Sequence, residues 1–261
     1  MSKDHERKIK EQFSRQASGF SNKSLTLNQE DLLTWILDSL DLKNDMSVLD
    51  VAGDTGILSR AIAPFVNHVT AVDISQEMIN EGMKQTEQKG ISNITYRIAN
   101  AENLPFKQES FDLVISRLGF HHFTNPSKIL KEMSKVCARN GTVGVIDMIS
   151  AEDDELSHLY NHYERLRDPS HFNALKRSQI IELFKNTRLK LKEVEVLDVP
   201  VHLDSWLALT KTDNHIKEKI THDIKTELEM RNVITGLSPY IENGEIMFKQ
   251  KWIKIIGKKN G

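Results

Sequence analysis

The sequence predicts an α/β fold built around a mostly parallel β-sheet, and three observations support this class. From residue 46 to about residue 149, the hydrophobic pattern alternates between a period of two and a period of 3.6, which is typical of repeated strand–helix–strand units. The segment 111–116 is almost entirely apolar, as expected of a strand that helices cover on both faces. Glycine turns and helix-capping residues separate the segments.

The first half of the chain contains five expected strands with helices between them. The turn 53–56 leads from the first strand into a helix with apolar residues at helical spacing. Ser75 can cap the next helix, which ends at Gly90, and Asn125 can cap another. The expected strands are 46–51, 68–72, 94–99, 111–116 and 142–149.

After residue 150 the rhythm changes to longer helical stretches. Helical periodicity covers 151–166, 178–186 and 213–231, and two further strands are expected at 189–199 and 246–256. Residues 257–261 are expected to form a frayed tail. Five lysines are expected on a solvated strand face or in this tail: Lys249, Lys251, Lys254, Lys258 and Lys259.

The composition narrows the class of protein. The 261 residues include 35 Lys and Arg against 37 Asp and Glu, so the basic excess of a typical nucleic-acid-binding domain is missing. No apolar run approaches the roughly 18 residues of a membrane span, and the charged N-terminus lacks a signal core. The single cysteine, Cys137, falls on an apolar helix stripe, and no Cys/His cluster suits zinc. We therefore expect a cytoplasmic protein with no metal and no nucleic-acid or membrane partner.

One motif follows the first strand. Residues 48–56 read VLDVAGDTG, a strand that ends in a turn of small residues before a helix N-terminus, and such a turn lets the backbone approach a ligand. The segment resembles the first motif of the class I S-adenosylmethionine-dependent methyltransferases, which is close to VLDVGCGTG. Ala52 and Asp54 replace two glycines of that motif. The alternative is a tight turn that binds nothing.

Further segments resemble the same family in the expected order. Asp73 ends the second strand 20 positions after Gly53, where a carboxylate can accept hydrogen bonds from both ribose hydroxyls. Residues 100–106, NAENLPF, are similar to the family's DAExLPF, and the amide oxygen of Asn100 can still accept from an adenine amino group. Residues 110–117 (SFDLVISR) and 121–123 (HHF) resemble the methyltransferase type 11 branch, to which the quinone-biosynthesis methyltransferases are related.

The resemblance implies a Rossmann-like, seven-stranded, mostly parallel sheet with an antiparallel last strand, helices on both faces and helical lid insertions. It implies one methyltransferase domain over residues 1–261. Within it we expect an N-terminal helical lid at 1–40, a donor-binding core at 41–150, a lid insertion at 151–186, and strands six and seven in 187–261 with a helical insertion at 201–244.

The resemblance also implies that the enzyme transfers a methyl group from S-adenosylmethionine to a small-molecule acceptor and releases S-adenosylhomocysteine. The donor would bind in the turns that follow the first four strands. Its expected contacts are Asp50, Ala52, Gly53, Asp54, Gly56, Asp73, Ile74, Asn100, Ala101, Glu102, Ser116 and Arg117.

An acceptor pocket is expected beyond the fourth strand and near residues 165–171 (RLRDPSH), where the predicted helix breaks at Pro169. A histidine there can take a proton near neutral pH, and arginines favour a carboxylate or phenolate. The alternative is that the histidines are merely packed and that the arginines pair with Asp168 at the surface. We expect His122 and His171 to be catalytic, and Arg117, His121, Arg167 and His171 to line the pocket.

Other functions remain open on the sequence. Ala52, Asp54 and Asn100 suggest a non-catalytic homologue that still binds S-adenosylmethionine. A Rossmann-type oxidoreductase is a second alternative, although residues 53–59 do not complete GxGxxG and Asp54 would face a pyrophosphate. Asp54 would help donor binding if it meets the donor's ammonium group and oppose it if it faces the donor's carboxylate; we expect a modest penalty. A homodimer is also left open.

Overall fold

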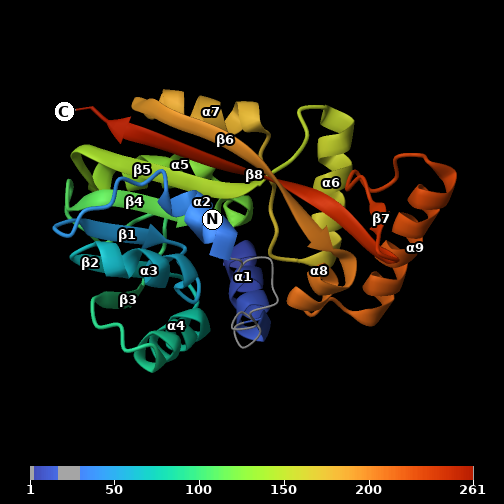
Figure 1. Cartoon of the computed structure of the whole chain (residues 1–261), viewed down its shortest axis with the longest axis horizontal. Coiled ribbons are helices and arrows are strands. Elements are labelled where there is room, and N and C mark those ends of the chain that lie inside the picture. Colours follow the sequence, from blue (N-terminus) through green and yellow to red (C-terminus); the bar gives the residue numbers. More distant parts are fainter. Residues whose placement is uncertain (1–2, 17–29, 261) are drawn as a thin grey trace.

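In the computed structural model, which describes residues 3–16 and 30–260, eight strands form one mixed sheet (Figure 1). The order is β3-β2-β1-β4-β5-β8-β6, and β7 pairs with β8. Strands β1 to β5 are parallel to one another, and β8 runs antiparallel to both β5 and β6. The strands are β1 Ser47–Val51, β2 His68–Asp73, β3 Ile94–Ile98, β4 Phe111–Arg117, β5 Cys137–Ile149, β6 Leu189–His202, β7 Tyr240–Glu242 and β8 Glu245–Lys259.

The helices begin where the sequence places capping residues. The Ser75 hydroxyl accepts a hydrogen bond from the Met78 amide, and the Asn125 side chain accepts one from the Lys128 amide, as predicted. The helices are α1 Lys3–Gln16, α2 Glu30–Leu37, α3 Ile57–Ile62, α4 Gln76–Gln88, α5 Pro126–Val136, α6 Asp154–Arg167, α7 Arg177–Asn186, α8 Leu203–Leu209 and α9 Asn214–Met230, with short 3-10 turns at Ala63–Phe65 and Phe120–His122.

Core side chains fill both faces of the sheet. Leu113 packs in a cluster with α2 and α3, whereas its neighbour Val114 packs in a second cluster with α5 and α7. Successive residues of a strand point to opposite faces, so a strand that is buried on both sides must be apolar at nearly every position. The interpretation of 111–116 as such a strand is confirmed.

The C-terminal strand departs from the prediction. β8 continues to Lys259 and pairs with β6 over its length, so the expected frayed tail is mostly strand. Lys254 is only 2% exposed; its Nζ lies 3.0 Å from Glu193 Oε1, 2.8 Å from Glu195 Oε2 and 4.6 Å from the ring centre of Trp35. The expectation of a solvated Lys254 was wrong, because strand periodicity cannot reveal which other elements cover a face.

Several boundaries also differ. Helix α5 ends at Val136, and Cys137 is buried as expected but begins β5 instead of continuing the helix. The sequence pattern revealed neither the short helix α8 nor β7, which adds an eighth strand to the seven expected. None of the helices described is both long and apolar enough to cross a membrane.

The expected lid is only partly N-terminal. Helix α1 lies beyond the carboxyl ends of β1 and β2, together with α6 and α8 (Figure 1). Helix α2 instead packs into the core through Leu32 and Ile36. The remainder of the lid expected at 1–40, residues 17–29, lies outside the described residues. The carboxyl edge of the sheet is therefore covered by segments far apart in the chain.

Candidate functional site

A cavity opens at the carboxyl ends of β1, β2 and β4, where ligands bind in open α/β sheets. It holds about 1190 Å³ not filled by protein atoms, including space open to solvent. All the expected donor-binding residues line it except Gly56 and Ser116, and so do Arg117, His121, His122 and Arg167 of the expected acceptor pocket. Residues of α1 and α8, which sequence reasoning did not identify, complete the wall: Ile9, Phe13, Gln16, Leu209 and Thr210.

The turn after β1 has a strained backbone at the positions where the family motif has glycine. Ala52 and Asp54 have φ angles of 54° and 55°, in the left-handed region that costs a non-glycine residue roughly 1–2 kcal/mol. Gly56 has a φ of 77°, and a Cβ there would collide with the Tyr96 hydroxyl. Gly56 therefore shapes the turn without lining the cavity. The backbone strain at Ala52 and Asp54 is typical of a functional site.

Three carboxylates meet at this end of the cavity. Asp50 Oδ2 accepts a 2.6 Å hydrogen bond from the Ser59 hydroxyl, and Asp73 accepts bonds from the backbone amides of Ser75 (2.9 Å) and Asp54 (3.1 Å). Burial raises the pKa of Asp50 to about 6, and burial and then the charge of Asp73 raise that of Asp54 to about 8. These shifts indicate an acidic site that favours a bound cation.

The acidic end fits S-adenosylmethionine. The Oδ1 atoms of Asp50 and Asp54 are buried and have no hydrogen-bond partner among the described residues. The donor carries a sulfonium and an ammonium group, which suit such acids. Asp73 is placed to hold the ribose, although both of its oxygens already accept backbone bonds. Asn100 Oδ1 likewise accepts from the Glu102 amide (2.9 Å), which leaves it one lone pair for an adenine amino group.

Two adjacent histidines also line the cavity. His121 Nδ1 lies 2.6 Å from Asp147 Oδ1, and His122 Nδ1 lies 2.9 Å from the Ser170 carbonyl oxygen. Because a carbonyl oxygen only accepts, His122 carries its proton on Nδ1 and a lone pair on Nε2. The two rings are 4.0 Å apart. Sequence reasoning missed Asp147; its signal was a single acid within the otherwise apolar segment 143–149 of β5.

The pKa values of the two histidines are shifted in opposite directions. Burial works against a charge on His121, but Asp147 outweighs it and raises the pKa of His121 above the ordinary value. Burial and the neighbouring His121 charge lower the pKa of His122 well below it. Pairs of titratable groups with pKa values pushed apart are typical of acid–base assignments in enzymes. Asp147 therefore favours the charged form of His121, whereas burial and the neighbouring His121 favour the neutral form of His122.

His171 lies behind this pair. Its ring stacks on His121 with centroids 5.4 Å apart, and its Nε2 donates to Asn161 Oδ1 at 2.7 Å. It is 3% exposed and is not among the residues that line the cavity. Burial and the two neighbouring histidines lower its pKa well below the ordinary value. His171 therefore contacts the site through His121.

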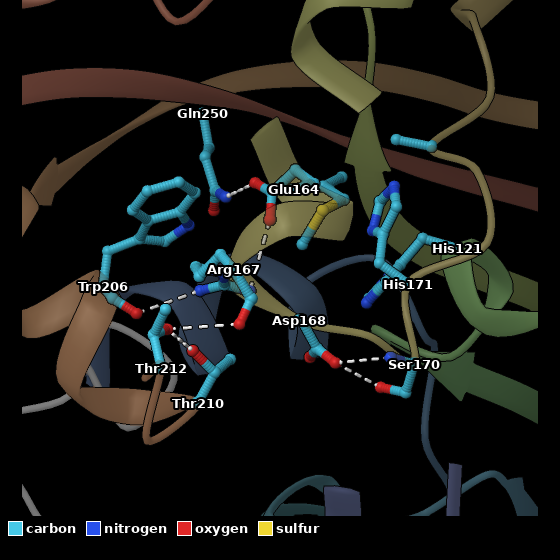
Figure 2. A network of polar contacts seen from close by, with 12 residues as sticks. His121, Glu164, Arg167, Asp168, Ser170, His171, Trp206, Thr210, Thr212 and Gln250 are labelled. Atoms are coloured by element: carbon cyan, nitrogen blue, oxygen red, sulfur yellow. Dashed lines mark hydrogen bonds and ion pairs between the residues drawn. The ribbon is translucent and has the colours of Figure 1, made fainter. Parts of the chain in front are cut away.

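A buried polar network holds the end of α6 at the wall. Figure 2 shows Glu164 between Gln250 and Arg167: Gln250 Nε2 donates to Glu164 Oε1 (2.9 Å), and Arg167 lies 3.2 Å from Glu164 Oε2. Arg167 also donates to the Trp206 carbonyl at 3.2 Å and lies over that indole ring, with its Cζ 4.7 Å from the ring centre. The surface ion pair considered for Asp168 is absent: Asp168 is buried and bonds to Ser170 (Figure 2).

Helix α1 closes the cavity from the other side. His5 Nε2 lies 2.7 Å from the His122 carbonyl oxygen, and Gln12 Nε2 donates to the Thr210 carbonyl at 2.6 Å. The Phe13 ring meets the His122 ring edge-on, with centroids 5.0 Å apart. These contacts let α1 exclude water from the space between the acids and the histidines. No group of three or more potential metal ligands occurs within 3–16 and 30–260.

Comparisons with known proteins agree with this geometry. A methyltransferase domain family matches residues 49–145. The uncharacterized methyltransferase YcgJ of Bacillus subtilis is 29% identical over 95% of this chain and 97% of its own, and its crystal structure superposes with a TM-score of 0.81 over 89% of this chain and 100% of its own, at 27% identity. The ubiquinone/menaquinone biosynthesis C-methyltransferase UbiE of Haemophilus ducreyi is 34% identical, over 49% of this chain and 51% of its own length.

The match extends well beyond residues 49–145, because the YcgJ structure covers 89% of this chain. The expected sheet topology, with its antiparallel strand between β5 and β6, is confirmed. A dinucleotide-dependent oxidoreductase is not what this chain resembles. Residues 49–145 are a methyltransferase domain of the type 11 family, the whole chain has the fold of the class I S-adenosylmethionine-dependent methyltransferases, and S-adenosylmethionine is the methyl donor.

Proposed function

We propose that this enzyme methylates a small-molecule acceptor that gives up a proton, and that His122 takes that proton. The observation that carries the proposal is the pair His121–His122, whose pKa values are shifted in opposite directions and which lines the same cavity as the donor-binding acids. The bound donor supplies an electrophilic methyl carbon on its sulfonium. The acceptor's heavy atom bonds to this carbon as the carbon–sulfur bond breaks, which leaves S-adenosylhomocysteine.

The chain's own residues supply position and proton transfer. His122 Nε2 has the free lone pair that a base needs, because its Nδ1 is committed to the Ser170 carbonyl. His121, held by Asp147, offers a positive charge that stabilises an anionic acceptor. His171 is a positioning residue that acts through the His121 ring. Helix α1 excludes the water that would compete with the acceptor.

The size and charge of the cavity support a small acceptor with an acidic or anionic group. Ligand pockets typically measure about 300–1,000 Å³, so this space suits a nucleoside-sized donor plus one small molecule. Arg117 and Arg167 both line it, and Arg167 Nε has no hydrogen-bond partner among the described residues. A phenol or a carboxylate-bearing acceptor fits this wall, in line with the pocket expected from the sequence.

The test begins with mass spectrometry of ligands that co-purify with the protein, followed by a methyl-transfer screen seeded by their masses. With an acceptor found, His122→Gln should lower turnover about 100-fold while the dissociation constant for S-adenosylhomocysteine stays unchanged. His158→Gln, on the exposed face of α6, is the matched control. Normal turnover in His122→Gln would exclude this base, and donor binding without turnover on any acceptor would favour a non-catalytic homologue.

A further inference from the structure

Asp54 is an acid at a position where the family motif has glycine, and the structure shows what surrounds it. Its backbone adopts a φ of 55°, and its amide donates to Asp73 Oδ2 at 3.1 Å, which fixes the residue at the cavity wall. Its Oδ1 is buried and has no hydrogen-bond partner among the described residues. A buried carboxylate oxygen without a partner is costly unless a ligand supplies one.

The charged groups that face Asp54 come from three strands. Asp50 lies one residue before the end of β1, Asp73 ends β2 and Arg117 ends β4; the charges of both acids oppose ionisation of Asp54, and that of Arg117 favours it. Arg117 is itself shared with Asp50 and Asp147. Asp50, Asp54 and Asp147 thus share one guanidinium, and Asp73 adds a further negative charge beside Asp54. An additional cation would be attracted here, and an additional carboxylate would be repelled.

The donor offers both kinds of group on its methionyl part, an ammonium and a carboxylate. We propose that the Asp54 carboxylate is the counter-ion of the donor's ammonium group and that donor binding drives one proton from Asp54 to solvent. The sequence left open whether Asp54 meets the donor's ammonium group or its carboxylate. The shared Arg117 guanidinium and the buried Asp54 oxygen without a partner favour the ammonium group. The proposal concerns the donor alone and does not depend on which acceptor is methylated.

The direction of the pH effect follows from the proton balance. Burial and Asp73 raise the pKa of Asp54 to about 8, so at pH 7 the free protein holds the carboxyl protonated. A bound ammonium favours the ionised form and lowers that pKa, so binding releases a proton. Affinity for an ammonium-bearing ligand therefore rises as the pH rises from 6 towards 8.

Two ligands separate this role from a structural one. S-adenosylhomocysteine carries the ammonium group, whereas 5′-methylthioadenosine has the same thioether nucleoside without the amino-acid part. In calorimetry at pH 8, Asp54→Asn should bind S-adenosylhomocysteine about 10-fold more weakly, as expected for loss of a hydrogen bond between charged groups. The affinity for 5′-methylthioadenosine should change less than twofold. Asp54→Gly should show the same pattern, with the turn relaxed.

Calorimetric titrations with S-adenosylhomocysteine at pH 7, in buffers of different ionisation enthalpy, measure how many protons are released when the ligand binds. The wild-type protein should release nearly one proton per ligand, and Asp54→Asn close to none. Proton release that persists in Asp54→Asn would assign the group to Asp50 or Asp73 and overturn the proposal. Equal loss of both ligands would indicate that Asp54 only shapes the turn, and tighter binding of S-adenosylhomocysteine by Asp54→Gly would indicate that the acid opposes the donor.

Discussion

The donor end and the acceptor end of the cavity differ in how far along the chain their residues lie. The acids Asp50, Asp54 and Asp73 follow two neighbouring strands within 24 positions, and their geometry comes from the β1 and β2 turns. The acceptor wall instead joins His122 to α1, and Arg167 to β8 and α8. The donor end is therefore formed by residues close together in the sequence, whereas the acceptor wall forms only when segments far apart in the sequence pack together.

This difference has consequences for mutation. Damage to the donor end should alter binding more than folding, because its acids bond only to nearby residues of the β1 and β2 turns and of the helices that follow them. Damage to the acceptor wall should alter stability and acceptor use together, because the same network holds the wall and the fold. The predictions below test this separation.

The largest effect is expected from Glu164→Ala. It removes the partner of the buried Arg167 charge and the acceptor of the Gln250 amide, and breaking one side of a buried ion pair costs about 3–5 kcal/mol. Thermal denaturation should show a fall in Tm of roughly 6–20 °C. Glu155→Ala, exposed on the same helix, is the control. The double variant Glu164→Leu/Arg167→Met should recover part of the loss; no recovery would contradict the ion-pair explanation.

Asp73→Ala should weaken donor binding without a comparable loss of stability. It removes two charge-assisted hydrogen bonds to the donor, which are worth about 2–4 kcal/mol. Calorimetry with S-adenosylhomocysteine measures the affinity, and a thermal melt of the ligand-free protein measures the fold. Asp204→Ala, an exposed acid on α8, should change neither quantity. An unchanged affinity in Asp73→Ala would contradict the assignment of the donor end.

Asp147→Asn should change the pH dependence of methyl transfer more than it changes the maximal rate. The pKa of His122 is lowered and that of His121 is raised, so the base is neutral and the acid charged in a window that includes pH 6.5. Activity should fall on the alkaline side as His121 loses its proton. Without Asp147 the pKa of His121 falls, so this alkaline limb should move to lower pH. An unmoved limb would mean that another group titrates there.

The smallest effect is expected from Ala52→Gly, which relaxes the strained turn. Glycine tolerates the observed φ of 54°, so the free energy of unfolding should rise by about 0.5–1 kcal/mol after the entropy cost of glycine is subtracted. Denaturant titration is the measurement, with Ala61→Gly in α3 as a control that should lose stability instead. A loss in both variants would mean that the alanine methyl contributes packing that outweighs the strain.

Local signals accounted for much of the fold and of the donor end. The Ser75 and Asn125 caps form as predicted, and the alternation of strands and helices correctly predicted that β1 to β5 are parallel. The donor turns were found because each lies within a few residues of a strand end. The bounds of β6 and β8 were too short, because these strands extend into a twisted pair that only their mutual hydrogen bonds define.

The acceptor wall was found only in part. His121 and His122 drew attention as a pair, but Asp147 lies 26 positions from His121, and nothing in the local sequence links the two. His171 was placed in the pocket because it lies close in sequence to Arg167, and the structure turns its ring against His121 and Asn161 instead. The residues of α1 and α8 carried no motif.

The sequence by itself therefore determined the α/β class and most strand and helix positions, because periodicity and turn chemistry act over a few residues, and its motifs indicated the family and the donor by resemblance. Only the tertiary structure decided that Lys254 is buried, that Asp147 fixes the proton of His121, and that α1, α6 and α8 share one cavity with the donor turns. Burial and charge pairing are set by whichever distant segment packs against a side chain, and no local pattern encodes that neighbour.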